Sequence, residues 1–410
     1  MGMEESARVS TARLSGALLP LPVLLPVLAV FSSRPAAAWQ AQPDPRTVFA
    51  EAQKALLARD YSKAEQGFRE LLRIDPHSAG GYANLGVVYL RTGRYDSAIK
   101  AFTEARKAAP LTQTQRAGLD LDLGLAFYRK QDFAKAIPAL ARVLESDPGH
   151  AQARYLLGIC YFMEDDHEHA VKTLEPLARD EQDNLDFLFE LGVAYGKVKR
   201  PEDSARTFAQ MVRAGGDSAQ MHLLLGIACL DLEQYARAQR ELEKVVALNP
   251  KMAFAHYNLG VVYQRLGKPE QAAREFKLEM ALAPDEPWSY ESLGTLYLQQ
   301  RDMDRALQMF GAALKIDPRL PNSLDGVGKV YLERGEPEKA IAYFRRAVEL
   351  VPDSAKMHFQ LGQAYVKTGR REKGQEEITK AQRLQARARK ELEEAVSGKL
   401  PPPNVDGDEP

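Results

Sequence analysis

A recurrence of 34 residues runs through most of this 410-residue chain and constrains its fold more than any other feature. Four hexapeptides show the shared register: NLGVVY at 84–89, NLGVVY at 258–263, SLGTLY at 292–297 and QLGQAY at 360–365. Ten units follow in this register, interrupted only by a four-residue insertion from Gln113 to Arg116. The units begin at residues 45, 79, 117, 151, 185, 219, 253, 287, 321 and 355. A period of this length predicts stacked supersecondary units that bury their apolar faces against their neighbours.

Each unit has the pattern of two helices joined by a polar turn. Positions 4, 7, 8 and 11 of the unit fall on one stripe of the first helix, which is helix rather than strand periodicity. Position 8 is Gly in nine units, although Gly inside a helix costs up to about 1 kcal/mol relative to Ala. We therefore expect a close approach of two helices there, with the Ala of position 20 on the second helix. The nine glycines are Gly86, Gly124, Gly158, Gly192, Gly226, Gly260, Gly294, Gly328 and Gly362.

The recurring Leu-Gly, aromatic, Ala, aromatic and Pro positions resemble the tetratricopeptide-repeat family over residues 45–388. The resemblance implies an all-α solenoid of antiparallel helix pairs that coils into a right-handed superhelix. Unit one departs from the pattern with Ala52 in place of Gly, and unit five with Ser204 in place of Ala. The Pro that closes most units is missing at Gln182 and Gly216.

Both ends of the chain differ from the repeats. Residues 371–396 carry one narrow apolar stripe, which predicts a C-terminal helix that caps the last repeat and ends within residues 389–397. Residues 398–410 are rich in Pro and then acidic, which predicts a disordered tail.

The first 38 residues have the order of a secretory signal peptide. Basic Arg8 and Arg13 precede an apolar run over residues 14–31, and Ala36 to Ala38 offer a small-residue cleavage site. This predicts cleavage before Trp39, a linker over residues 39–44, and a secreted or periplasmic protein. The alternative is that residues 14–31 stay uncleaved as a membrane anchor, but three prolines within the run disfavour a spanning helix.

The composition and motifs give no sign of catalysis. A formal net charge of −1 argues against nucleic acid as a partner. Cys160 and Cys229 are expected to be small buried hydrophobes, too far apart for a disulfide. The acidic and histidine-containing segment 164–169 is interpreted as a solvated turn rather than a metal site. Because no phosphate-binding loop, nucleophile motif or zinc motif is present, we expect no enzyme, no cofactor and no small-molecule substrate.

The resemblance therefore implies an interaction scaffold that binds a protein or peptide segment of unidentified sequence. The alternative is a membrane-tethered accessory subunit of an envelope or secretory assembly that binds through its outer surface. Binding of a chaperone's C-terminal tail is not expected, because that mode in this family uses Lys at position 5, and no unit has Lys there.

The predicted binding surface lies on the first helices, opposite their packed stripe. Positions 2, 6, 9 and 13 point there, with positions 5 and 12 beside them, and we call these six positions the inner face because they line the concave surface in this family. In units three to seven the inner face is mostly apolar, which predicts a recognition surface. Its residues are Leu125, Leu156, Ile159, Met163, Val193, Leu224, Ile227, Phe254, Tyr257, Asn258 and Val261. The competing interpretation is that these side chains pack between repeats, and toward the C-terminus the inner face becomes polar.

Overall fold

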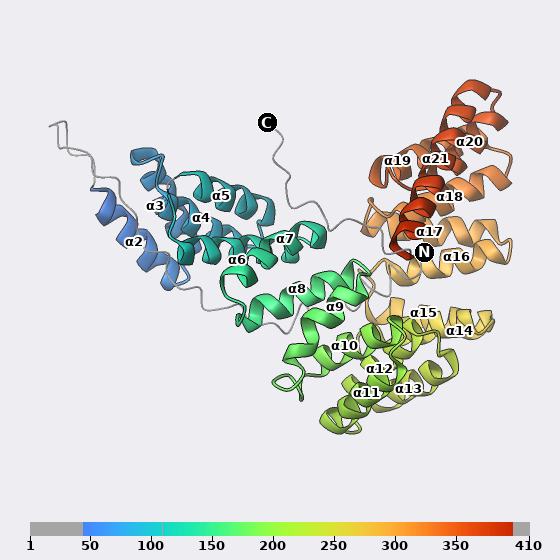
Figure 1. Cartoon of the computed structure of the whole chain (residues 1–410). Coiled ribbons are helices and arrows are strands. Elements are labelled where there is room, and N and C mark those ends of the chain that lie inside the picture. The colour runs from blue at the N-terminus through green and yellow to red at the C-terminus, as the bar shows by residue number, and fades with distance from the viewer. Residues whose placement is uncertain (1–43, 109, 397–410) are drawn as a thin grey trace. The chain divides into compact units, whose positions relative to one another are not determined.

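The computed structural model describes residues 44–108 and 110–396, and within these ranges it contains helices and no strand. The helices form two compact units, one up to residue 214 and one from residue 215. Consecutive helices pack as antiparallel pairs within each unit (Figure 1). The all-α helix-pair class expected from the sequence is therefore confirmed, while the right-handed superhelix stays a prediction.

The N-terminal unit holds the first five repeats. Its helices are α2 (Pro45–Leu57), α3 (Tyr61–Ile74), α4 (Ala79–Arg91), α5 (Tyr95–Ala108), α6 (Gln113–Arg129), α7 (Phe133–Ser146), α8 (Ala151–Met163), α9 (His167–Leu174), the 3-10 helix η1 (Glu175–Leu177), α10 (Leu185–Lys197) and α11 (Pro201–Gly215).

The C-terminal unit holds the other five repeats. Its helices are α12 (Ala219–Asp231), α13 (Tyr235–Leu248), α14 (Ala255–Arg265), α15 (Pro269–Leu282), α16 (Trp288–Gln299), α17 (Met303–Ile316), α18 (Pro321–Glu333), α19 (Pro337–Leu350), α20 (Ala355–Lys367) and α21 (Arg371–Val396).

The helix bounds follow the 34-residue register. Every first helix ends at position 13 and every second helix begins at position 17, from Leu57 and Tyr61 in repeat one to Lys367 and Arg371 in repeat ten. The four-residue insertion extends α6 at its N-terminus by about one turn. Thr112 caps this added turn, because its hydroxyl accepts from the Gln115 N–H while the Gln115 side chain accepts from the Thr112 N–H.

The turn between the two helices of a repeat has the same left-handed residue in all ten copies. Position 15 has a positive φ throughout, at Arg59, Gly93, Gln131, Asp165, Lys199, Glu233, Gly267, Arg301, Gly335 and Gly369. Four of these are Gly, which adopts this conformation without the steric cost of a Cβ. The other six repeats hold a residue with a Cβ in a left-handed conformation, which costs stability.

The glycine at position 8 makes room for the side chain at position 24 of the same repeat. A Cβ on Gly86 would lie 2.5 Å from Cε1 of Phe102, closer than real Cβ contacts come. The position-24 side chains that fill this space in the other eight repeats with Gly are Leu140, Leu174, Phe208, Leu242, Phe276, Phe310, Phe344 and Ile378. Position 20 also touches the first helix as expected, since the Ser204 hydroxyl donates to the Gly192 carbonyl at 2.7 Å. The close approach is thus present, and a bulky side chain fills it.

In repeat one the glycine at the close approach of the two helices lies on the second helix instead of the first. Its position 8 is Ala52, and the second helix supplies the glycine, Gly67. A Cβ on Gly67 would lie 2.6 Å from Cβ of Ala52. The departure of repeat one from the Gly pattern is therefore compensated within its own helix pair.

Repeat four has a shortened second helix. In most repeats this helix ends at position 30, but α9 ends at Leu174 (position 24) and continues into η1, which contains Pro176. Pro176 has no backbone N–H and therefore cannot make the α-helical hydrogen bond to the residue four positions before it. The chain then runs through turns to Asn184, which caps α10 by accepting from the Phe187 N–H.

Helix α21 takes the place of the second helix in repeat ten and continues without a break to Val396. Among the residues that the structure describes, no helix combines the length and apolarity needed to cross a membrane. The predicted signal peptide and the predicted tail lie outside the described residues, as does most of the predicted linker.

Candidate functional site

The structure buries most of the apolar inner face that the sequence suggested as a binding surface. The exposed fraction is 3% or less at nine of the eleven positions, namely Leu125, Leu156, Ile159, Val193, Leu224, Ile227, Tyr257, Asn258 and Val261. Only Met163 and Phe254 are half-buried. Successive first helices contact one another within each unit, so these side chains pack between repeats. The premise that they are available to a partner was wrong, because a solenoid uses this face to bury apolar surface between neighbouring repeats.

Buried carboxyl groups also lie on this packed face in the N-terminal unit. Burial raises the pKa of Asp122 to about 7, although the charge of Arg91 acts in the opposite direction. Burial likewise raises the pKa of Glu190, and the Tyr155 hydroxyl donates to its Oε2 at 3.3 Å. The raised pKa values favour protonated carboxyls, which suits packing between helices better than exposed acidic contacts.

A pocket of about 380 Å³ remains on the inner face of repeats eight to ten. Positions 9, 12 and 13 of α16, α18 and α20 supply most of its lining. The lining residues are Leu298, Gln299, Arg301, Met303, Lys329, Leu332, Glu333, Gln360, Gln363 and Lys367. Four of these residues belong to the C-terminal part of the inner face, which is polar in the sequence: Lys329, Gln360, Gln363 and Lys367. The others were missed, although positions 12 and 13 follow the same periodicity.

The lining of this inner-face pocket carries more positive than negative charge. The lining contains three cationic residues, Arg301, Lys329 and Lys367, and one acidic residue, Glu333. The carboxylate of Asp325 is almost fully buried, and its Oδ2 lies 2.8 Å from Nζ of the lining residue Lys329. The same oxygen lies 2.9 Å from Nζ of Lys356. Asp325 therefore pairs with Lys329 of the lining and with Lys356 through one oxygen.

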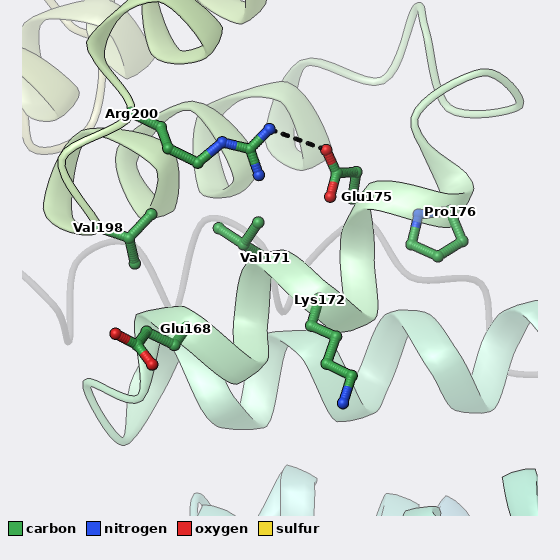
Figure 2. Close-up of a pocket in the computed structure, with 7 residues that line it drawn as sticks. All are labelled: Glu168, Val171, Lys172, Glu175, Pro176, Val198 and Arg200. Atoms are coloured by element: carbon green, nitrogen blue, oxygen red, sulfur yellow. Dashed lines mark hydrogen bonds and ion pairs between the residues drawn. The ribbon is translucent and has the colours of Figure 1, made fainter. Parts of the chain in front are cut away.

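A second pocket of about 500 Å³ lies beside the second helix of repeat four, α9, at the point where this helix ends early (Figure 2). We call it the outer pocket. It is lined by Glu168, Val171, Lys172, Glu175, Pro176, Val198 and Arg200. Nη2 of Arg200 lies 3.1 Å from Oε1 of Glu175, and Figure 2 shows Lys172 directed away from this pair. The sequence signal for this pocket was Pro176 within the second helix, which we did not connect with a cavity.

The remaining candidates for chemistry have structural roles. Cys160 and Cys229 are buried and unpaired, as expected, and burial raises the pKa of both thiols. Asp166 caps α9 by accepting from the His169 N–H, and the ring of His169 stacks on Tyr161 at 5.1 Å between centroids. Across the described ranges, no three His, Cys, Asp or Glu side chains converge as a metal site would require.

Comparison with known proteins gives one curated relative and several solved structures. Over 96 residues the chain is 29% identical to "Anaphase-promoting complex subunit 3" of Schizosaccharomyces pombe, an alignment that spans 23% of this chain and 14% of the relative. A crystal structure of MamA aligns with 40% of this chain and 97% of its own length, at 22% identity and a TM-score of 0.37. The crystal structure of the APC/C hetero-tetramer Cut9-Hcn1 aligns with 83% of this chain and 87% of that chain, at 15% identity and a TM-score of 0.40.

Family models cover most of the repeat region. Models described as "Tetratricopeptide repeat" match residues 55–119, 121–183, 223–287, 289–320 and 355–388. A model described as "TPR repeat" matches residues 328–369. Together these matches cover most of residues 55–388, and the chain therefore belongs to the tetratricopeptide-repeat family.

Proposed function

We propose that this protein is a non-catalytic scaffold that binds an acidic segment of a partner protein in the inner-face pocket of repeats eight to ten. Tetratricopeptide repeats support protein–protein interaction as the general function. The observation that carries the finer proposal is that this pocket stays open after the repeats have packed, and that cations predominate in its lining.

The chemistry of the lining favours an extended acidic peptide. Lys329 and Lys367 lie on successive first helices, so a chain running across α18 and α20 passes both ammonium groups. Gln360 and Gln363 offer amide donors and acceptors to the backbone of such a chain. Leu298, Met303 and Leu332 supply apolar contact between the polar groups.

The expected affinity is modest and depends on salt. Ion pairs at exposed sites contribute about 0.2–1 kcal/mol each, and salt screens them over about 10 Å at 0.1 M ionic strength. Two or three such pairs give a preference for acidic over basic peptides of about tenfold.

Binding of two labelled peptides tests this function. The first is a fluorescein-labelled dodecapeptide of alternating Glu and Gly, and the second has Lys in place of Glu. Fluorescence anisotropy at 50 mM salt should show tighter binding of the Glu peptide to the full chain. The double variant Arg301→Glu with Lys367→Glu should lose at least tenfold in affinity, whereas Lys172→Glu in the outer pocket should bind as the wild type does. Equal binding of both peptides, or unchanged binding by the double variant, would show that the pocket is not the site.

The second candidate function is that of an accessory subunit which binds through its outer surface. The outer pocket favours it, because this cavity lies on the second helices and a break in repeat four creates it. If the protein is such an accessory subunit, residues 14–31 remain attached as a membrane tether. If it is the exported scaffold, these residues are cleaved off with the export signal. N-terminal sequencing of the mature protein separates the two. A start at or near Trp39 supports export as a secreted or periplasmic protein, and an intact N-terminus supports the tether.

A further inference from the structure

The last repeat exposes apolar side chains at two positions where the apolar residues of earlier repeats are buried or half-buried. The half-buried ones are Leu121 at position 5 and Leu56, Leu298 and Leu332 at position 12. Position 5 is 8% exposed or less in Phe49, Tyr155, Phe189, Leu223 and Tyr257, and position 12 is equally buried in Leu90, Tyr128, Phe162 and Leu230. The corresponding residues of repeat ten are Phe359 and Val366, which are 43% and 45% exposed. Both lie on α20, seven residues and about two turns apart, on one side of the helix.

The reason for this difference is that, among the residues the structure describes, no helix covers one side of α20. Each earlier repeat is followed by another, and contacts between consecutive first helices are seen from α14 to α16, from α16 to α18 and from α18 to α20. Helix α21 packs on a different side of α20, where a Cβ on Gly362 would meet Ile378 at 2.7 Å. Phe359 and Val366 therefore form the surface on which the first helix of a further repeat would pack. We call the two residues the end face.

The charges beside the end face distinguish between possible occupants. At 100° per residue, Lys356, Gln363 and Lys367 lie about 50–90° from the line through Phe359 and Val366, all on the flank toward the inner-face pocket. Lys356 contacts Asp325 but keeps half of its side chain exposed. A second copy of this chain docked through the same face would bring these lysines close to their own counterparts, which is unfavourable. A helix with acidic residues beside its apolar stripe would complement both features.

We propose that the end face binds an amphipathic α-helix of a partner protein, with the partner's apolar stripe on Phe359 and Val366 and its acidic flank on Lys356 and Lys367. The site adjoins the inner-face pocket, with which it shares Lys367, but it binds through Phe359 and Val366 and goes beyond the function proposed above. The partner helix takes the place that the first helix of the next repeat holds beside α14, α16 and α18. It buries the two side chains that the array itself leaves in water.

Two synthetic 21-residue helices test the proposal. One carries Leu at i, i+3, i+4 and i+7 spacing with Glu on both flanks, and the other has Lys in place of every Glu. Anisotropy of the labelled peptides with the full chain should show at least fivefold tighter binding of the Glu helix. The double variant Phe359→Ser with Val366→Ser should weaken that binding at least tenfold. Since both side chains are already exposed, circular dichroism should show wild-type helix content and melting.

The matched control is Leu278→Ser with Leu282→Ser. These leucines are also half exposed, at 48% and 43%, but they lie on α15 away from the end face, so the control should bind the Glu helix within twofold of wild type. Arg301→Glu, which alters only the inner-face pocket, should also stay within twofold and so separates this site from that one. The proposal is overturned if the Glu helix does not bind, if the Lys helix binds equally well, or if both double variants lose the same affinity. Sedimentation showing a dimer that Phe359→Ser with Val366→Ser abolishes would also overturn it, because the occupant would be a second copy.

Discussion

Two glycines in the C-terminal unit allow the packing at position 8 to be measured against a neutral site. Gly328 is at position 8 of repeat nine, and a Cβ there would lie 2.5, 2.7 and 2.8 Å from Cε1, Cζ and Cδ1 of Phe344. Phe344 is fully buried, so its ring has no room to move aside. Gly311 is also inside a helix, α17, but a Cβ there would meet nothing within 4 Å.

We expect the same substitution to have opposite effects at the two sites. Replacing Gly by Ala in a helix interior contributes up to about 1 kcal/mol of stability. At Gly328 this gain is outweighed by overpacking, which costs about 1–3 kcal/mol in a tight core. Gly328→Ala should therefore destabilise the chain by about 1–2 kcal/mol, and Gly311→Ala should stabilise it by about 0.5–1 kcal/mol.

Urea unfolding followed by circular dichroism measures both changes on the full chain. Because contacts in a repeat array are local, hydrogen exchange should show the loss in Gly328→Ala concentrated in α18 and α19. If Gly328→Ala raised the midpoint as much as Gly311→Ala does, the ring of Phe344 would not be confined and the packing argument would fail.

Three further predictions concern the turns, a buried carboxyl and the thiols. Glu233→Gly should raise the free energy of unfolding by up to about 1 kcal/mol, because Glu233 has a positive φ, and Gly93→Ala should lower it by a similar amount. Urea unfolding measures both changes, and equal shifts of one sign would contradict this. The pKa of Asp122 is raised from 3.8 to about 7, so the folded state holds a proton that the unfolded state releases, and stability falls as pH rises from about 4 to about 7. Asp122→Asn should therefore stabilise the chain by about 1–4 kcal/mol at pH 8 and have little effect near pH 4, as urea midpoints at the two pH values will show. Burial raises the pKa of the Cys229 thiol to about 11 and holds the pKa of the Cys160 thiol well above its usual value. A thiol reagent should therefore modify neither in the native protein at pH 8 and both in urea, and rapid native labelling would place a thiol at the surface.

The sequence predicted the repeats well because their signature is steric and local. A glycine at position 8 and a bulky side chain at position 24 determine how two adjacent helices meet, and both can be read within one unit. The left-handed residue at position 15 could be anticipated only at the four glycines, since Gln131 or Lys199 gives no such signal in sequence.

The binding surface was harder to predict because exposure depends on the neighbouring repeat. Helical periodicity places Ile159 and Leu224 opposite the packed stripe of their own repeat, but it does not show that the adjacent repeat covers them. The same periodicity places Lys329 and Gln363 on this face, but the sequence did not predict the pocket that they line. The outer pocket depends on where a shortened helix ends, which Pro176 alone does not determine.

Site-specific photocrosslinking tests the central claim most directly. Gln363 in the inner-face pocket, or Leu278 on α15 as the reference position, is replaced by the photoreactive residue benzoylphenylalanine in the full chain. Each protein is then irradiated with the fluorescein-labelled Glu-Gly peptide. We predict crosslinking at position 363 that 0.5 M salt suppresses, and little at position 278. Equal labelling at both positions, or none at 363, would contradict binding of an acidic segment in this pocket.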